Sequence, residues 1–304
     1  MTLQINAPSL LELVDEDVEL ERLGTGFTFT EGPIWNPRGY LLFSDMPGDV
    51  RRRWDEDGGV REVANPSNKG NGMTLDASGR LVVCEHVTSS VVRMDPDGSG
   101  HGREVLATHY EGKELNSPND VIVADDGAIL FTDPTFGRMP GFGIEREQEL
   151  SFQGVYRIPP DGGDPELLVD DFEQPNGLCF SPDNSLLYIN DTMRAHIRVF
   201  DVRPDGSIGN GRVVADGVGS GDLQRGDLAD GMKVDERGNI WVTGTGGVMV
   251  FAPDGQHLGT VEVPENVGNI NWGGPNWSWL FIPATTSLYR LKCTVSGNRL
   301  SYMR

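Results

Sequence analysis

The amino-acid sequence predicts an all-β fold, a six-bladed β-propeller of four-stranded blades. One pattern recurs six times along the 304 residues: a polar residue, a short alternating strand, a turn that contains Gly or Asn, and a second, more apolar strand. Two further strand-like runs follow each copy, and Asp-Gly and Pro-Asp-Gly turns, which commonly join β-strands, recur between the runs. Four strands repeated six times form a six-bladed propeller.

The copies of this repeat begin at intervals close to the length of one propeller blade. Their starts lie 40, 48, 57, 54 and 39 residues apart, and a four-stranded blade takes roughly 40–45 residues. The sixth copy is degenerate. The copies are EGPIWNPRGYLLFSD from Glu31, NGMTLDASGRLVVCE from Asn71, NDVIVADDGAILFTD from Asn119, NGLCFSPDNSLLYIND from Asn176, DGMKVDERGNIWVTG from Asp230 and NINWGGPNWSWLFIP from Asn269.

The last blade has only a weak signal for a fourth strand after Cys293. We therefore expect the N-terminal segment from Val18 to Leu23 to pair there and close the ring, because an open propeller leaves unpaired strand edges. No linker interrupts the series of repeats. The sequence thus predicts a single domain over residues 1–304, in which residues 1–16 are an N-terminal extension.

Composition argues against several classes of protein. The net charge is −21 and no basic run is long enough to neutralise phosphates, so we expect no nucleic-acid partner. No run of 18 apolar residues is present and the N-terminus is acidic, which indicates neither a membrane span nor an export signal. The three cysteines, Cys84, Cys179 and Cys293, lie in apolar stretches without metal-site spacing, as buried reduced thiols do. These features predict a cytoplasmic protein without a membrane partner, and none of them fixes its oligomeric state.

The first residue of every repeat carries a side-chain oxygen. The first strand of each propeller blade lines the central channel, so these residues should converge on one mouth of that channel. Carboxylate and amide oxygens suit a hard divalent cation, Ca²⁺ before Mg²⁺ or Mn²⁺, and the lack of His and Cys here disfavours zinc. Asn and Asp also begin strands simply as turn formers, but Glu is a poor turn former. The six residues are Glu31, Asn71, Asn119, Asn176, Asp230 and Asn269.

The loops that follow the second strands should surround the same mouth. One of them carries His86, a candidate for substrate binding or proton transfer. Another is the long insertion 134–154, whose length, glycines and aromatic residues are typical of a lid or specificity loop. Its Arg138 and Arg146 could offer a cation to a substrate. We expect the substrate contacts to be Asn71, Glu85, His86, Asn119, Asp133 and Phe136.

Five motifs in order resemble the gluconolactonase, senescence marker protein and luciferin-regenerating enzyme superfamily, with bacterial gluconolactonase-type members as the closer match. They are EGPIW at Glu31, SPND at Ser117, FTDP at Phe131, PNGLCFSPD at Pro175 and DGMKVDERGNIWV at Asp230. The resemblance runs from about Glu31 to Arg290 and again implies a six-bladed propeller. It implies one divalent metal ion bound by Glu31, Asn176 and Asp230, with Asn119 as a fourth ligand or a close substrate contact. Ca²⁺ is common among members, and Zn²⁺, Mn²⁺, Mg²⁺ and Fe²⁺ also occur.

The resemblance implies a hydrolase that opens a small-molecule lactone, a sugar lactone or similar. Asp230 is then the general base for the attacking water or, as in phosphotriesterase-like relatives, a nucleophile. Ser117 stands where the animal aldonolactonases carry a substrate-binding Arg, so sugar-lactone recognition does not simply transfer. Two alternatives stay open: an organophosphate or phosphotriester hydrolase on the same metal site, and a non-catalytic calcium-stabilised propeller that binds a partner.

Overall fold

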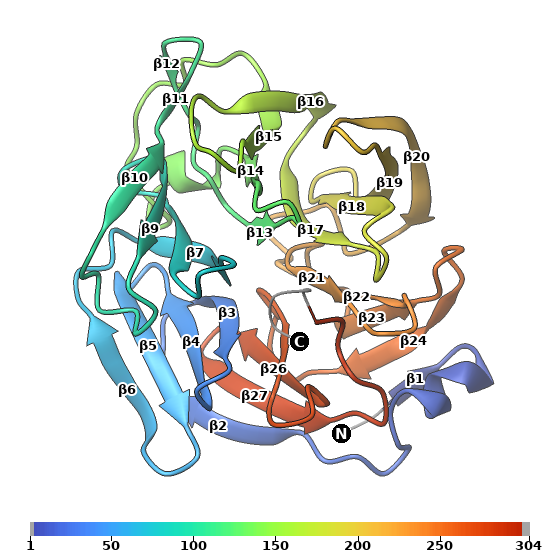
Figure 1. Cartoon of the computed structure of the whole chain (residues 1–304). Coiled ribbons are helices and arrows are strands. Elements are labelled where there is room, and N and C mark those ends of the chain that lie inside the picture. The colour runs from blue at the N-terminus through green and yellow to red at the C-terminus, as the bar shows by residue number, and fades with distance from the viewer. Residues whose placement is uncertain (1–2, 300–304) are drawn as a thin grey trace.

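A computed structural model describes residues 3–299, in which six antiparallel sheets form a ring around a central channel (Figure 1). A seventh sheet is the separate two-stranded hairpin of β11 (His109–Tyr110) and β12 (Lys113–Glu114). The predicted six-bladed propeller is confirmed. In five of the blades the four strands are consecutive in the sequence, and the first of them lies innermost. Blade one consists of β3 (Thr30–Asn36), β4 (Tyr40–Asp45), β5 (Val50–Asp55) and β6 (Gly59–Ala64), and blade two of β7 (Gly70–Leu75), β8 (Leu81–Glu85), β9 (Ser90–Met94) and β10 (Glu104–Ala107). Blade three consists of β13 (Val121–Val123), β14 (Ile129–Asp133), β15 (Gln153–Ile158) and β16 (Glu166–Phe172), and blade four of β17 (Pro175–Phe180), β18 (Leu186–Asp191), β19 (His196–Val202) and β20 (Ile208–Asp216). Blade five consists of β21 (Met232–Val234), β22 (Ile240–Gly244), β23 (Gly247–Phe251) and β24 (His257–Glu262).

The sixth blade is completed by the N-terminal segment. Strand β2 (Glu21–Thr25) pairs antiparallel with β27 (Ser287–Lys292), which follows β25 (Asn271–Gly273) and β26 (Trp279–Ala284). The expected ring closure is therefore confirmed, although the strand begins and ends a little later than expected. The guanidinium of Arg290 lies 2.7 Å from the Glu21 carboxylate and 2.8 Å from that of Glu56, and so ties the closing strand to the first blade.

Residues of the N-terminal extension also join the ring, which the sequence did not indicate. Strand β1 (Leu3–Ile5) pairs with β24 and adds a fifth strand to blade five. The short 3₁₀ helix η1 (Pro8–Glu12) follows it, and the side chain of Leu10 is fully buried in the core cluster shared by blades one, five and six. The extension thus covers an outer strand edge that would otherwise stay open.

Apolar side chains fill the space between neighbouring blades. The rings of Trp241 and Trp272 meet edge to face at 5.1 Å between blades five and six, and such pairs add to the gain from area burial alone. The three cysteines are buried and free, as expected. Within residues 3–299 there is no helix of the length and apolarity that a membrane crossing requires.

Candidate metal and substrate site

Glycines after the first residues of the repeats allow the inner strands to approach closely. A Cβ atom on Gly32 would lie 1.8 Å from the carbonyl oxygen of Asn71, and one on Gly177 would lie 2.3 Å from that of Asp230. No larger residue fits at these distances, and Gly32 has a φ of 51°, which favours glycine as well. The Glu-Gly, Asn-Gly and Asp-Gly pairs of the repeat therefore draw the polar residues into a narrow ring.

Side chains of the second strands hold this ring in place. Ser44 Oγ donates a hydrogen bond of 3.0 Å to the carbonyl oxygen of Asn71, and Thr132 Oγ1 donates one of 2.9 Å to that of Asn176. Asn190 Nδ2 likewise donates to the carbonyl oxygen of Asp230. Each donor belongs to the blade before the one it supports, so neighbouring blades fix the positions of the ring residues jointly.

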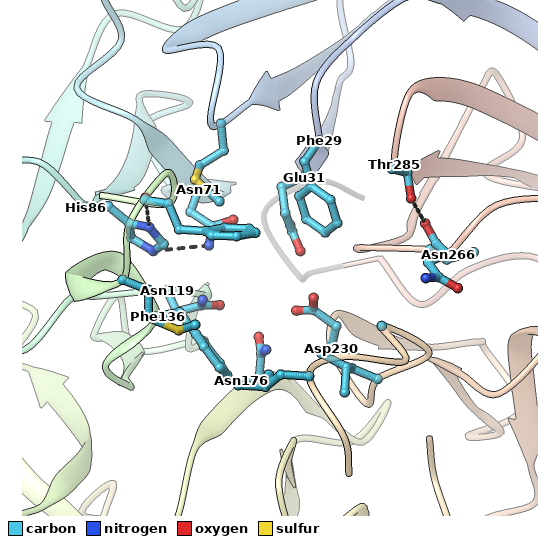
Figure 2. A pocket seen from close by; sticks show the side chains of 17 residues that line it. Phe29, Glu31, Asn71, His86, Asn119, Phe136, Asn176, Asp230, Asn266 and Thr285 are labelled. Carbon is cyan, nitrogen blue, oxygen red and sulfur yellow. Dashed lines mark hydrogen bonds between the residues drawn. The ribbon is translucent and has the colours of Figure 1, made fainter. Parts of the chain in front are cut away.

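The ring residues lie at the end of a cavity of about 300 Å³. In Figure 2 the side chains of Glu31, Asn119, Asn176 and Asp230 point from four blades toward one space, and Asn71 also lines the cavity. Asn269, the sixth ring residue, does not line the cavity, and its Nδ2 donates a hydrogen bond of 2.9 Å to Glu31 Oε2. The structure thus brings together five of the six side chains expected at the channel mouth.

Two carboxylates in this ring face each other without a basic partner. Burial raises the pKa of Glu31 to about 7, and the negative charge of nearby Asp120 adds to this effect. The pKa of Asp230 lies well above its usual range, first because of burial and then because of the charges of Glu31 and Asp120. Within the described part of the chain, no Lys or Arg lines the cavity. A site of this charge favours protons or a cation.

The donor atoms fit a hard divalent cation. Asn176 Nδ2 donates a hydrogen bond of 3.1 Å to Thr192 Oγ1, while its Oδ1 is buried and has no hydrogen-bond partner. A buried oxygen without a partner is costly unless a ligand satisfies it. No group of three or more His, Cys, Asp or Glu side chains among the described residues is placed to hold a metal. Two carboxylates beside amide oxygens therefore suit Ca²⁺ better than Zn²⁺.

His86 lines the cavity as a neutral side chain. Its Nδ1 donates a hydrogen bond of 2.9 Å to the carbonyl oxygen of Phe142, and its Nε2 accepts one of 3.2 Å from Asn71 Nδ2 (Figure 2). Burial lowers the pKa of His86 to about 4. Because both ring nitrogens are engaged and the ring carries no positive charge at neutral pH, the structure favours a role in positioning over the proton transfer considered above.

Glu85 and Asp133 have structural roles in place of the substrate contacts expected from the sequence. Neither residue lines the cavity. Asp133 accepts hydrogen bonds of 2.8 Å from the backbone N–H groups of Asn116 and Ser117, and Glu85 pairs with Arg103 at 2.7 Å. The second strand ends at an acidic residue in four of the six blades, and there the side chain anchors neighbouring loops. Glu85 and Asp133 are two of these four residues, so their presence is explained by the repeat and does not require a substrate.

The long loop after β14 covers one side of the cavity. It begins with the short 3₁₀ helix η2 (Phe136–Arg138), and Phe136, Met139 and Phe142 line the cavity. Its two arginines do not. Arg138 donates to the backbone carbonyl of Asn116 at 2.8 Å and Arg146 to that of Val87 at 3.1 Å. These contacts anchor the loop, and the expectation that its arginines offer a cation to the substrate is wrong.

Several apolar residues of the cavity wall were missed in the sequence. Phe29, Leu228 and Val267 each lie two positions before a ring residue, and alternate residues of an extended chain share a face. That offset could have identified them. At the equivalent position in blade three, Ser117 is sealed off, because its Oγ accepts from the Gly137 N–H at 2.9 Å and Gly137 packs directly over it.

Comparison with known proteins places the chain in a family. A family model described as the SMP-30/gluconolactonase/LRE-like region matches residues 29–286. The chain belongs to this family. A relative, the gluconolactonase of Zymomonas mobilis, is 30% identical over 96% of this chain and 86% of its own length.

Solved structures of family members agree with this assignment. The gluconolactonase XC5397 of Xanthomonas campestris is 37% identical, and the match covers 96% of this chain and 95% of that one with a TM-score of 0.87. A second structure, of a protein described as a gluconolactonase, is 34% identical, and the match covers 98% of this chain and 100% of that one with a TM-score of 0.89. The motifs quoted above from the sequence thus identified the family correctly.

Proposed function

We propose that this protein is a metal-dependent lactonase that uses the cavity at the channel mouth to open a lactone ring by attack of water. One observation carries the proposal: two carboxylates and the unpartnered Oδ1 of Asn176 face one space at the end of a cavity large enough for a small molecule. Membership of a family whose named relatives are gluconolactonases supports the same reaction class.

The proposed metal ligands are Glu31, Asn119, Asn176 and Asp230, with Ca²⁺ as the first candidate. A divalent cation bound there would polarise the lactone carbonyl and stabilise the negative charge that develops on its oxygen. The hydrogen bond from Asn176 to Thr192 keeps the amide oxygen turned toward the space between the two carboxylates. The ligand oxygens are thereby held in place before any ion arrives.

In this proposal Asp230 is the general base. Its carboxylate points into the cavity (Figure 2), so an incoming water can reach it. When ionised, it takes the proton from the water that attacks the carbonyl carbon; the ring C–O bond then breaks, and that proton passes to the departing alkoxide oxygen, which becomes the hydroxyl of the open-chain acid. Asn71 Oδ1, which is buried and has no partner in the structure, can accept a hydrogen bond from the substrate or the water. Neutral His86 holds the other end of that amide, and Phe136 provides an apolar contact.

Turnover of lactones and phosphotriesters by the same calcium-loaded preparation tests this function. We expect hydrolysis of at least one lactone, with kcat/KM well above that for any phosphotriester. Turnover of phosphotriesters alone would instead support an organophosphate hydrolase on the same site. If neither class is hydrolysed while the protein still binds calcium with a rise in melting temperature, the chain is a non-catalytic calcium-stabilised propeller.

A further inference from the structure

The wall of the cavity differs in chemistry from its floor. The floor carries the oxygen-bearing ring residues, whereas the wall between these residues and the solvent is built mainly from apolar side chains of five segments. The rings of Phe29 and Phe142 meet edge to face at 5.8 Å on one side. Phe136 approaches from the loop after β14, and Leu223 and Leu228 from the segment between β20 and β21. A molecule in this cavity therefore contacts polar groups at one end and hydrocarbon along its sides.

Most of the few polar groups on the wall already have partners. Both nitrogens of His86 are hydrogen bonded, as described above, and Thr285 Oγ1 donates a hydrogen bond of 2.9 Å to the backbone carbonyl of Asn266 (Figure 2). Asn266 lies at the exposed rim, where its Nδ2 is 3.4 Å from the carbonyl oxygen of Arg225. Among the described residues that line the cavity, the buried side-chain oxygens without a hydrogen-bond partner, Asn71 Oδ1 and Asn176 Oδ1, both belong to the floor. A polyhydroxylated ligand would need many more.

Leu223 lies at the mouth with an apolar side chain that is 41% exposed. It belongs to a segment without strands or helices, and it is one of few large apolar side chains with that much exposure. Because this side chain also lines the cavity, a ligand that reaches the mouth would cover part of it. The apolar wall thus continues from the ring to the solvent, which points to a ligand with a hydrocarbon part of some length.

We infer that the substrate is a lactone whose ring carries an alkyl or aryl group in place of the hydroxyl groups of a sugar lactone. This inference rests on the proposed lactonase function and names its substrate class. Each hydroxyl that entered the cavity would lose hydrogen bonds to water without a replacement on the wall, which weakens binding. Each methylene or aromatic carbon gains by leaving water. The lactone carbonyl lies toward the polar residues of the cavity floor, and the hydrocarbon group lies between Phe136, Phe142 and Leu223.

The first test is the ratio of kcat/KM for apolar lactones to that for glucono-δ-lactone in the calcium-loaded full chain. Dihydrocoumarin and δ-decalactone represent the aryl and alkyl classes. We expect at least one of them to exceed glucono-δ-lactone by about tenfold or more, since even single hydrophobic contacts in a pocket discriminate on that scale. An equal or higher value for glucono-δ-lactone overturns the substrate class and leaves the lactonase function intact. If no lactone is hydrolysed, the proposed function itself fails.

The second test replaces one wall residue. Leu223→Gln should lower the ratio of kcat/KM for the preferred apolar lactone to that for glucono-δ-lactone by roughly tenfold. Leu11→Gln is the matched control, because Leu11 is also an exposed leucine, lies in η1, and does not line the cavity. It should leave the ratio unchanged. Both substituted side chains are exposed, so melting temperatures should stay close to that of the parent protein. An unchanged ratio in the folded Leu223→Gln variant contradicts the inference.

Discussion

Replacing Asp230 with Asn is expected to lower kcat for lactone hydrolysis by about 10²- to 10⁴-fold, the usual cost of losing a general base. The substitution keeps an oxygen that can bind a cation and keeps the size of the side chain. It removes the ionisable carboxylate to which the proposal assigns the role of base. The loss should therefore appear in kcat at saturating calcium and substrate. A variant with a nearly unchanged kcat would rule out Asp230 as the base.

Two further variants separate this role from metal binding. Asn176→Ala removes a proposed ligand and leaves the base in place, so its activity should recover in part when calcium is raised, whereas that of Asp230→Asn should not. Asp201→Asn is the matched charge control. Asp201 lies in β19, the third strand of blade four, where its side chain is exposed and 3.6 Å from Arg212. It does not belong to the proposed site, so its replacement should change neither kcat nor calcium affinity.

The calcium affinity of the protein is expected to fall by roughly tenfold or more between pH 8 and pH 6. With its pKa raised to about 7, Glu31 holds a proton at pH 6 in the metal-free protein, and a cation has to displace it. Above pH 7 the carboxylate is ionised and this competition ends. The raised pKa of Asp230 acts in the same direction. Calcium titration by calorimetry at several pH values measures the effect, and an affinity that stays constant or rises toward pH 6 would contradict it.

Protonation of Glu31 also affects the stability of the folded protein when no metal is bound. A carboxyl group whose pKa is higher in the folded than in the unfolded state stabilises the fold when protonated, and this contribution is lost as the pH rises from the unfolded value to the folded one. For Glu31 the pKa rises from 4.5 to about 7 on folding, so this stabilisation is lost between pH 4.5 and about pH 7. The rise in melting temperature on adding calcium should accordingly be larger at pH 8 than at pH 5.5.

The fold was predictable because its information is local and repeated. Each blade carries its own turns and alternation, and the glycine after Glu31, Asn71, Asn176 and Asp230 marks the close approach of inner strands. Ring closure by β2 followed from counting strands. The docking of β1 on β24 did not, because three residues are too few to show a period, and their partner is fixed only by the position of blade five.

The candidate site was predictable in its floor and only in part in its wall. Ring residues recur at one offset in every repeat, so the sequence alone could bring Glu31 and Asp230 together. The wall depends on loops that differ between blades. Leu223 lies in a segment without repeat character, and Glu85 and Asp133 were misassigned because an acid at the end of a strand looks the same whether it faces a cavity or anchors a backbone.

Lactone turnover during the return of calcium to metal-free protein tests the central claim most directly. The protein is treated with a chelator, its metal content is measured by elemental analysis, and calcium is then titrated back while the initial rate is followed. We expect no turnover above background in the metal-free protein and a rate that rises to a plateau at one equivalent of calcium per chain. Full turnover by protein shown to be free of metal would contradict the account.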